Sequence, residues 1–218
     1  GSGNVLCHGE SSGWASANAF GGTTPYSWLW GAGTTPTDSV GQGLSAGVHR
    51  VTITDAHGCP DIMTVSIAEP PALQAQILPV DVKCFGESTG SAKVIASGGT
   101  SPYAYIWWNG AQTAEIGQLE AGLVGLTVSD GNGCSMPVTM EITQPALPVS
   151  GTADMREPRC FGDHNGQILI TPEGGTPPYR YALDNKPFNG SSIQIGLTAG
   201  NYLPRIMDKN GCIADLMH

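Results

Sequence analysis

The 218-residue chain has a net charge of −9, only 12% charged residues, and 31 glycines and 16 prolines. So many turn-forming residues argue against a helical protein, and the 40% apolar content argues against disorder. An acidic chain without a Lys/Arg cluster is a poor partner for nucleic acid or anionic membranes, and no apolar run is long enough for membrane insertion. We therefore expect many short strands joined by turns.

One phrase, Gly-Gly-Thr-x-Pro-Tyr, occurs three times, beginning at Gly21, Gly98 and Gly174. A cysteine precedes each copy by 14 residues, and Leu-x-Ala-Gly and then a second cysteine follow it. Self-similarity at a fixed period defines the architecture of a chain. We expect three domains: repeat 1 (residues 1–71), which lacks a leading strand; repeat 2 (72–147), which is complete; and repeat 3 (148–218), whose last strand is cut short.

Alternating apolar residues predict the strands of each repeat. The strand after the first cysteine has small apolar residues on one face, and the strand after the phrase has aromatic residues on one face. In repeat 2 these inward-facing residues are Ala92, Val94, Tyr103, Tyr105 and Trp107. The pattern predicts an all-β fold, a tandem array of three small immunoglobulin-like antiparallel β-sandwich modules.

The recurring phrases are explained most simply as turns. In Gly-Gly-Thr-x-Pro-Tyr the glycines allow the corner, the proline fixes φ, and the tyrosine fills the core. In "DAHGC", "DGNGC" and "DKNGC" we expect the aspartate to accept bonds from backbone N–H groups at a hairpin turn. The glycine before each second cysteine would supply the left-handed position.

The six cysteines fall two to a repeat. The simplest pairing joins the two within each repeat: Cys7–Cys59, Cys84–Cys134 and Cys160–Cys212. Closing loops of this size would add roughly 4 kcal/mol each in the chain-entropy model. Such disulfides imply an oxidising, extracytoplasmic compartment.

Metal binding is the alternative use of these segments. His8 and His57 flank Cys7 and Cys59 and could complete a zinc site, but the other repeats have no matching histidines. Calcium is the better alternative, because a disulfide within each repeat would bring two acidic positions together. Turn capping explains the aspartates more simply, so we expect no cofactor. The candidate calcium ligands are Glu10, Asp55, Glu87, Asp130, Asp163 and Asp208.

The stretch "CFGESTGSAKVIASGGTSPYAYIWWNG…LEAGLVGLTVSDGNGCSMPVTMEITQP" resembles the SprB-type repeat of Bacteroidota gliding-motility adhesins. Repeat 1 departs from it in reading Cys-His-Gly for Cys-Phe-Gly. The resemblance implies a very large cell-surface protein, exported by type IX secretion, that attaches cells to polysaccharides and solid surfaces. It implies neighbouring repeats and the secretion and motility machinery as partners, and it carries no catalytic residues.

Three functions remain to be weighed. An enzyme is disfavoured, because no catalytic motif is present and the five histidines do not recur at matching positions. Two tryptophans that fall outside the predicted inward face, Trp14 and Trp108, could contact polysaccharide or glycans. A stalk of serially linked modules needs no pocket. We expect an extracellular adhesin segment that acts mainly as a stalk, with direct glycan binding as the alternative.

Overall fold

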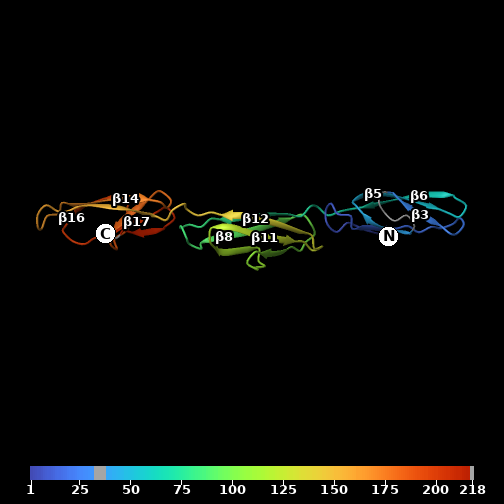
Figure 1. The fold of residues 1–218 in the computed structure, drawn as a ribbon, viewed down its shortest axis with the longest axis horizontal. Coiled ribbons are helices and arrows are strands. Elements are labelled where there is room, and N and C mark those ends of the chain that lie inside the picture. The colour runs from blue at the N-terminus through green and yellow to red at the C-terminus, as the bar shows by residue number, and fades with distance from the viewer. Residues whose placement is uncertain (32–37, 217–218) are drawn as a thin grey trace. The chain divides into compact units, whose positions relative to one another are not determined.

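The computed structural model describes residues 1–31 and 38–216 (Figure 1). The described residues contain no helix, and so none long and apolar enough to cross a membrane. The strands of repeat 1 are β1 (Ser2–Gly3), β2 (Gly13–Ser16), β3 (Ser27–Trp30), β4 (Val40–Leu44), β5 (Gly47–Thr54) and β6 (Pro60–Ile67). Those of repeat 2 are β7 (Gln74–Val80), β8 (Gly90–Ser97), β9 (Ala104–Trp107), β10 (Glu115–Leu119), β11 (Gly122–Ser129) and β12 (Ser135–Ile142). Those of repeat 3 are β13 (Ser150–Arg156), β14 (Gly166–Glu173), β15 (Arg180–Leu183), β16 (Ile193–Leu197), β17 (Pro204–Met207) and β18 (Ile213–Asp215).

The described strands form six three-stranded sheets, two in each repeat. The strand orders are β1-β2-β4 with β3-β5-β6, β10-β8-β7 with β12-β11-β9, and β13-β14-β16 with β15-β17-β18. Every strand pair whose register is defined is antiparallel. The chain is an all-β tandem array of three immunoglobulin-like β-sandwich modules, as the alternating pattern predicts.

Repeat 1 does have a short leading strand. The two-residue β1 pairs with β2 in the register in which β13 pairs with β14, Gly3 facing Trp14 as Arg156 faces Gln167. The position that we expected to be empty in repeat 1 is therefore taken by two residues.

The chain divides into two compact units. The first consists of Gly1–Ile77, Val94–Ala114 and Gly125–Val138, and the second of Leu78–Lys93, Glu115–Val124 and Thr139–His218. Each unit contains a hydrophobic core of its own.

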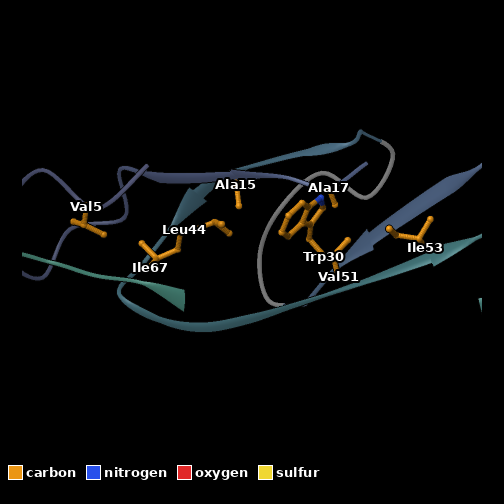
Figure 2. Packing of buried hydrophobic residues seen from close by; sticks show 8 residues of the cluster. All are labelled: Val5, Ala15, Ala17, Trp30, Leu44, Val51, Ile53 and Ile67. Carbon is orange, nitrogen blue, oxygen red and sulfur yellow. The ribbon is translucent and has the colours of Figure 1, made fainter. Parts of the chain in front are cut away.

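The core of the first unit is built from residues of β2, β3, β4, β5 and β6 of repeat 1 and their flanking segments (Figure 2). Trp30 fills its centre at 4% exposure, and Figure 2 shows Leu44 beside Ile67 and Ala15. The small residues Ala15 and Ala17 leave room for the indole, which donates through Nε1 to the carbonyl of Asp38 at 3.1 Å. Alternation of large and small side chains thus packs the two sheets together.

The second unit contains the equivalent core of repeat 3. Ile168, Ile170 and Ile206 are each no more than 2% exposed, and Tyr181 and Leu183 pack with them. Burial raises the pKa of the Tyr181 hydroxyl, and the neighbouring Tyr179 raises it further. These are the inward-facing positions that the period-2 pattern predicts.

The Gly-Gly-Thr-x-Pro-Tyr phrase forms the corner between the two sheets of a module. In repeat 2, Gly98 and Gly99 take positive φ angles of 70° and 57°, which favour glycine. The Tyr103 hydroxyl returns across the corner and donates to the carbonyl of Gly98 at 2.6 Å. Tyr179 bonds Gly174 in the same way at 2.6 Å, and Tyr26 bonds Gly21. The X-Pro peptide of each phrase is cis.

Candidate functional site

The cysteines pair between repeats, not within them. Cys7 of repeat 1 bonds Cys134 of repeat 2, and Cys84 of repeat 2 bonds Cys212 of repeat 3, each with a Cα–Cα distance of 5.6 Å. The first cysteine of one repeat thus forms a disulfide with the second cysteine of the next repeat. The predicted pairs Cys7–Cys59, Cys84–Cys134 and Cys160–Cys212 are wrong.

The two cysteines of one repeat cannot meet because they lie at opposite ends of the same module. Val5, two residues before Cys7, donates to the carbonyl of Ala68 at 2.9 Å, just past the end of β6. Cys59 precedes the first residue of β6, which is eight residues long. A strand of that length separates its ends by about 23 Å, far beyond the reach of a disulfide.

Each second cysteine belongs to a hairpin turn that is organised by one aspartate. In repeat 2, Asp130 Oδ1 accepts the backbone N–H groups of Asn132 at 3.0 Å and Cys134 at 2.8 Å. Its Oδ2 accepts the N–H of Thr100, in the Gly-Gly-Thr phrase, at 2.8 Å. Asp55 and Asp208 make the same three bonds in their own repeats. The carboxylate therefore caps the hairpin turn, as we expected, and in addition connects the hairpin to the corner phrase by a hydrogen bond.

These bonds change the acidity of the aspartates. The N–H groups of Cys59, Thr23 and His57 lower the pKa of Asp55 below its usual value of 3.8. Burial raises the pKa of Asp130, but the backbone N–H groups around it, that of Thr100 foremost, outweigh burial and lower the pKa below 3.8. Hydrogen bonds to the charged form account for both shifts.

A side-chain amide bridges the repeats beside each disulfide. Asn132 Nδ2 donates to the carbonyl of Leu6 in repeat 1 at 2.8 Å, and Asn210 Nδ2 donates to the carbonyl of Lys83 in repeat 2 at 2.9 Å. Each amide also reaches a threonine hydroxyl of its own corner phrase at 3.1 Å. We call these two assemblies of disulfide and amide the cysteine joints: the first is Cys7, Cys134, Leu6 and Asn132, and the second is Cys84, Cys212, Lys83 and Asn210.

In repeats 1 and 2, the segment that leaves the repeat closes the loop of the first cysteine. Glu69 Oε2 accepts the N–H of Gly9 at 2.7 Å, and Gln144 Oε1 accepts the N–H of Gly86 at 2.8 Å. Both glycines lie two residues after a joint cysteine, at φ angles of 77° and 74°. Each of these two loops is therefore held in shape by a hydrogen bond within its own repeat.

The two candidate tryptophans lie on the surface and are not part of the joints. Trp14 of β2 is 44% exposed, and its ring covers the backbone of Gly3 beside a shallow pocket of about 420 Å³ that Gln42 also lines. Trp108 is 53% exposed. Its ring lies edge-on to the ring of the buried Trp107, and the two ring centroids are 6.2 Å apart. Both are half-exposed aromatic surfaces, and ligand contact at either stays a prediction.

A family model for the SprB repeat matches residues 2–35, 79–112 and 152–188. This chain carries SprB repeats. No curated protein matches it. Three solved structures of longer chains are similar at 12–14% identity. They are the eight N-terminal immunoglobulin domains of Down Syndrome Cell Adhesion Molecule isoform 1.30.30 (TM-score 0.36, 88% of this chain and 31% of that one), Sidekick-1 immunoglobulin domains 1–5 (0.34, 88% and 52%) and the human Desmocollin-1 ectodomain (0.26, 78% and 42%).

The acidic residues of the SprB repeats do not gather as the calcium hypothesis required. That hypothesis depended on disulfides within a repeat. The observed disulfide of Cys7 instead places Glu10 near the Cys134 hairpin of the next repeat, and Glu10 and Cys134 line the same shallow pocket. The oxygens of Asp55, Asp130 and Asp208 already accept backbone N–H bonds. Within residues 1–31 and 38–216, no three His, Cys, Asp or Glu side chains are placed to hold a metal ion. Calcium binding stays a prediction for the six candidate ligands, Glu10, Asp55, Glu87, Asp130, Asp163 and Asp208.

Reasoning from the sequence missed the joint amides and the loop-closing residues of the SprB repeats. A signal for the amides was present, because "DGNGC" and "DKNGC" share an asparagine two residues before the cysteine, where repeat 1 has His57. The acceptors, by contrast, are backbone carbonyls of Leu6 and Lys83, which no side-chain pattern marks.

Proposed function

We propose that this chain is a repeat segment of a large extracellular adhesin, and that it acts mainly as a disulfide-linked stalk. One observation carries the proposal: each joint bonds a repeat covalently to the next. Such bonds would pass tension across the short proline-bearing links between modules. They also require the oxidising surroundings of an exported protein.

The stalk is proposed as non-enzymatic. The features that recur in all three repeats are core residues, corner phrases, aspartate hairpins and cysteines, each of which has a structural role above. The SprB family supports the wider proposal: cell-surface location, type IX secretion, and a part in gliding motility or attachment together with the secretion and motility machinery. In this role the segment would hold an adhesive part of its protein away from the cell.

Direct binding of polysaccharide or glycans is the alternative function. The exposure of Trp108 favours it, because the indole is 53% exposed directly after β9, and Ile106, two residues earlier, is 54% exposed. Aromatic surface of this kind can stack on a sugar ring, although single exposed aromatic residues are common.

Binding to immobilised polysaccharides separates the two functions. The wild-type chain and Trp108→Ala would be applied to a panel of polysaccharides, with calcium in one arm and a chelator in the other. The stalk predicts no retention of either protein in either arm. Trp14→Ala tests the second candidate tryptophan, which is 44% exposed and lies in a different repeat.

The contrary result would be that the wild-type chain is retained and that retention of Trp108→Ala is at least tenfold lower. It would make the repeats themselves the adhesive surface. Retention only in the calcium arm would in addition identify a metal-dependent site. Circular dichroism of each variant would show that the loss is not one of folding.

A further inference from the structure

The two cysteine joints differ in how accessible their sulfur atoms are. Cys134 of the first joint is half-buried, whereas its counterpart in the second joint, Cys212, is only 8% exposed. Cys134 Sγ lies 3.5 Å from the carbonyl oxygen of Leu6 in an exposed contact, and Cys212 Sγ lies 3.4 Å from that of Lys83 in a half-buried one. We infer that the first joint is a thiol-exchange site, at which a small thiol without negative charge opens the Cys7–Cys134 disulfide while the second joint stays closed.

A shallow pocket leads to the first disulfide. Its volume is about 520 Å³, and both bonded cysteines, Cys7 and Cys134, line it. Ala72 and Leu73, from the segment that joins repeats 1 and 2, also line it, and all four residues belong to the first compact unit. The rate of thiol–disulfide exchange depends on access to the sulfur that is attacked. The pocket gives a small thiol that access at the first joint.

The charges around the first joint select against an anionic thiol. Glu10 lines the pocket, and Glu69 Oε1 lies 3.3 Å from Nδ1 of His8, the residue that follows Cys7. Among the described residues that line the pocket, none is lysine or arginine. Two carboxylates therefore face an incoming molecule, and they favour a neutral or positively charged thiol.

The second joint has a different balance of charge. Lys83 stands there in the place of Leu6, and Gln144 makes the hydrogen bond that Glu69 makes at the first joint. The acidic residue of this joint, Glu87, is thus accompanied by a cation. An anionic thiol is repelled more strongly at the first joint than at the second.

Exchange at the first joint proceeds in two steps. The incoming thiolate attacks Cys134 Sγ and forms a mixed disulfide, while the bond to Cys7 Sγ breaks and Cys7 leaves as a thiolate with the electron pair. A second thiolate attacks the mixed disulfide and releases Cys134 as a thiolate. Two thiols are thereby oxidised to one disulfide, and the two cysteines take up the two protons that the thiols gave up. The covalent link from repeat 1 to repeat 2 opens, and the link from repeat 2 to repeat 3 remains.

Initial rates of reduction of the two joints test the inference. The full chain would carry Cys59→Ser and Cys160→Ser, because these two residues are unbonded and exposed and their thiols would exchange with the joints. It would be treated with 2-mercaptoethanol at about pH 8 and low salt, where an ordinary histidine is uncharged. Samples would be alkylated with iodoacetamide at intervals and mapped by mass spectrometry without reductant. We expect the first joint to open about ten times faster than the second.

Equal rates, or faster opening of the second joint, would overturn the inference, because global unfolding exposes both disulfides alike. Chains with a single joint are the control for coupling between the two. Cys84→Ser, Cys212→Ser keeps only the first joint, and Cys7→Ser, Cys134→Ser keeps only the second. The same difference in rate is expected between these two chains, and its loss would also overturn the inference.

An anionic thiol of the same length, 2-mercaptoethanesulfonate, tests the selectivity for charge. The preference for the first joint should fall about fivefold with this thiol and recover in about 0.5 M salt. Glu69→Gln is the matched variant, because Gln144 makes the equivalent hydrogen bond in repeat 2. It should raise the rate with the sulfonate at the first joint about twofold and leave the rate with 2-mercaptoethanol unchanged.

An equal preference for the first joint with both thiols would overturn the exclusion of anionic thiols. Circular dichroism of Glu69→Gln would show that its fold is unchanged. The rates report on the disulfides alone, whereas the stalk proposal is tested by retention on polysaccharides. Either one can therefore fail while the other stands.

Discussion

At the scale of single residues, the aspartate of each hairpin is the side chain on which most of the local structure depends. Asp130 is 6% exposed and accepts three backbone N–H groups from two phrases that lie 30 residues apart. A buried carboxylate is tolerated because its lone pairs are satisfied. The same residue positions Cys134 for the first joint, so turn geometry and cross-linking are coupled.

Acid should therefore destabilise the fold through these carboxylates. The pKa values of Asp55 and Asp130 are lower in the folded state than in the unfolded chain, where they return to about 3.8. Their contribution is complete above that value and is lost as the pH falls through the lower, folded pKa. The free energy of unfolding should stay level from about pH 7 to pH 5 and fall below about pH 4. Urea unfolding followed by circular dichroism would measure it.

Asp130→Asn is the control for this pH dependence. An asparagine has no charge to lose, so the variant should be less stable at neutral pH and should lose less stability on acidification. Equal falls for the wild type and Asp130→Asn would contradict the assignment.

At the scale of elements, the corner phrase sets how closely the strands before and after it approach the hairpin. Gly99 has a φ of 57°, and a Cβ there would stand 2.6 Å from Asp130 Oδ2. Gly110 has a similar φ of 84°, but nothing lies within 4 Å of its Cβ position. Substituting each of the two glycines therefore separates the cost of a left-handed backbone from the cost of a steric clash with a neighbouring side chain.

Gly99→Ala should accordingly be more destabilising than Gly110→Ala. The left-handed conformation alone costs an alanine about 1–2 kcal/mol, which is the loss expected for Gly110→Ala. Gly99→Ala adds displacement of the aspartate, for which we expect about 1–3 kcal/mol more. Chemical denaturation of both variants would measure the difference. Equal losses would mean that the phrase needs glycine only for its φ angle.

The elements were predictable from the sequence, and the joints were not. Period-2 alternation identified the buried faces, including Trp30 and Trp107, because a strand buries every second residue wherever it lies in the chain. Pairing of cysteines depends instead on which end of a module each one occupies. Spacings of 50 and 52 residues are compatible with either end, so the pattern that revealed the repeats could not show that Cys7 faces the next repeat.

At the scale of the whole molecule, the two disulfide loops interleave. Each closes more than half of the chain, with separations of 127 and 128 residues, and Cys84 lies inside the first loop while Cys134 lies inside the second. The shortest covalent route from Cys7 to Cys212 therefore crosses both bonds and only the 50 residues between Cys84 and Cys134. A chain cross-linked in this way can extend only to a limited length.

Pulling the chain by its ends would measure that limit. After complete unfolding, Cys7 and Cys212 should stand at most about 180 Å apart, against about 740 Å in the reduced chain. In Cys84→Ser, Cys212→Ser the route is the 78 residues from Cys134 to Cys212, and the limit should rise to about 280 Å. Single-molecule force spectroscopy resolves these lengths. The pairing Cys7–Cys59 would instead give this variant a limit of about 550 Å, which would contradict the joints.

Interleaving has a second result, which concerns cleavage by proteases. A single backbone cut between Cys7 and Cys84 leaves its two fragments joined by the first disulfide, and a cut between Cys134 and Cys212 leaves them joined by the second. A cut between Cys84 and Cys134 leaves both disulfides bridging the break. No single nick between Cys7 and Cys212 can release a fragment, so a chain exposed to extracellular proteases would remain in one piece until it is cut again or reduced.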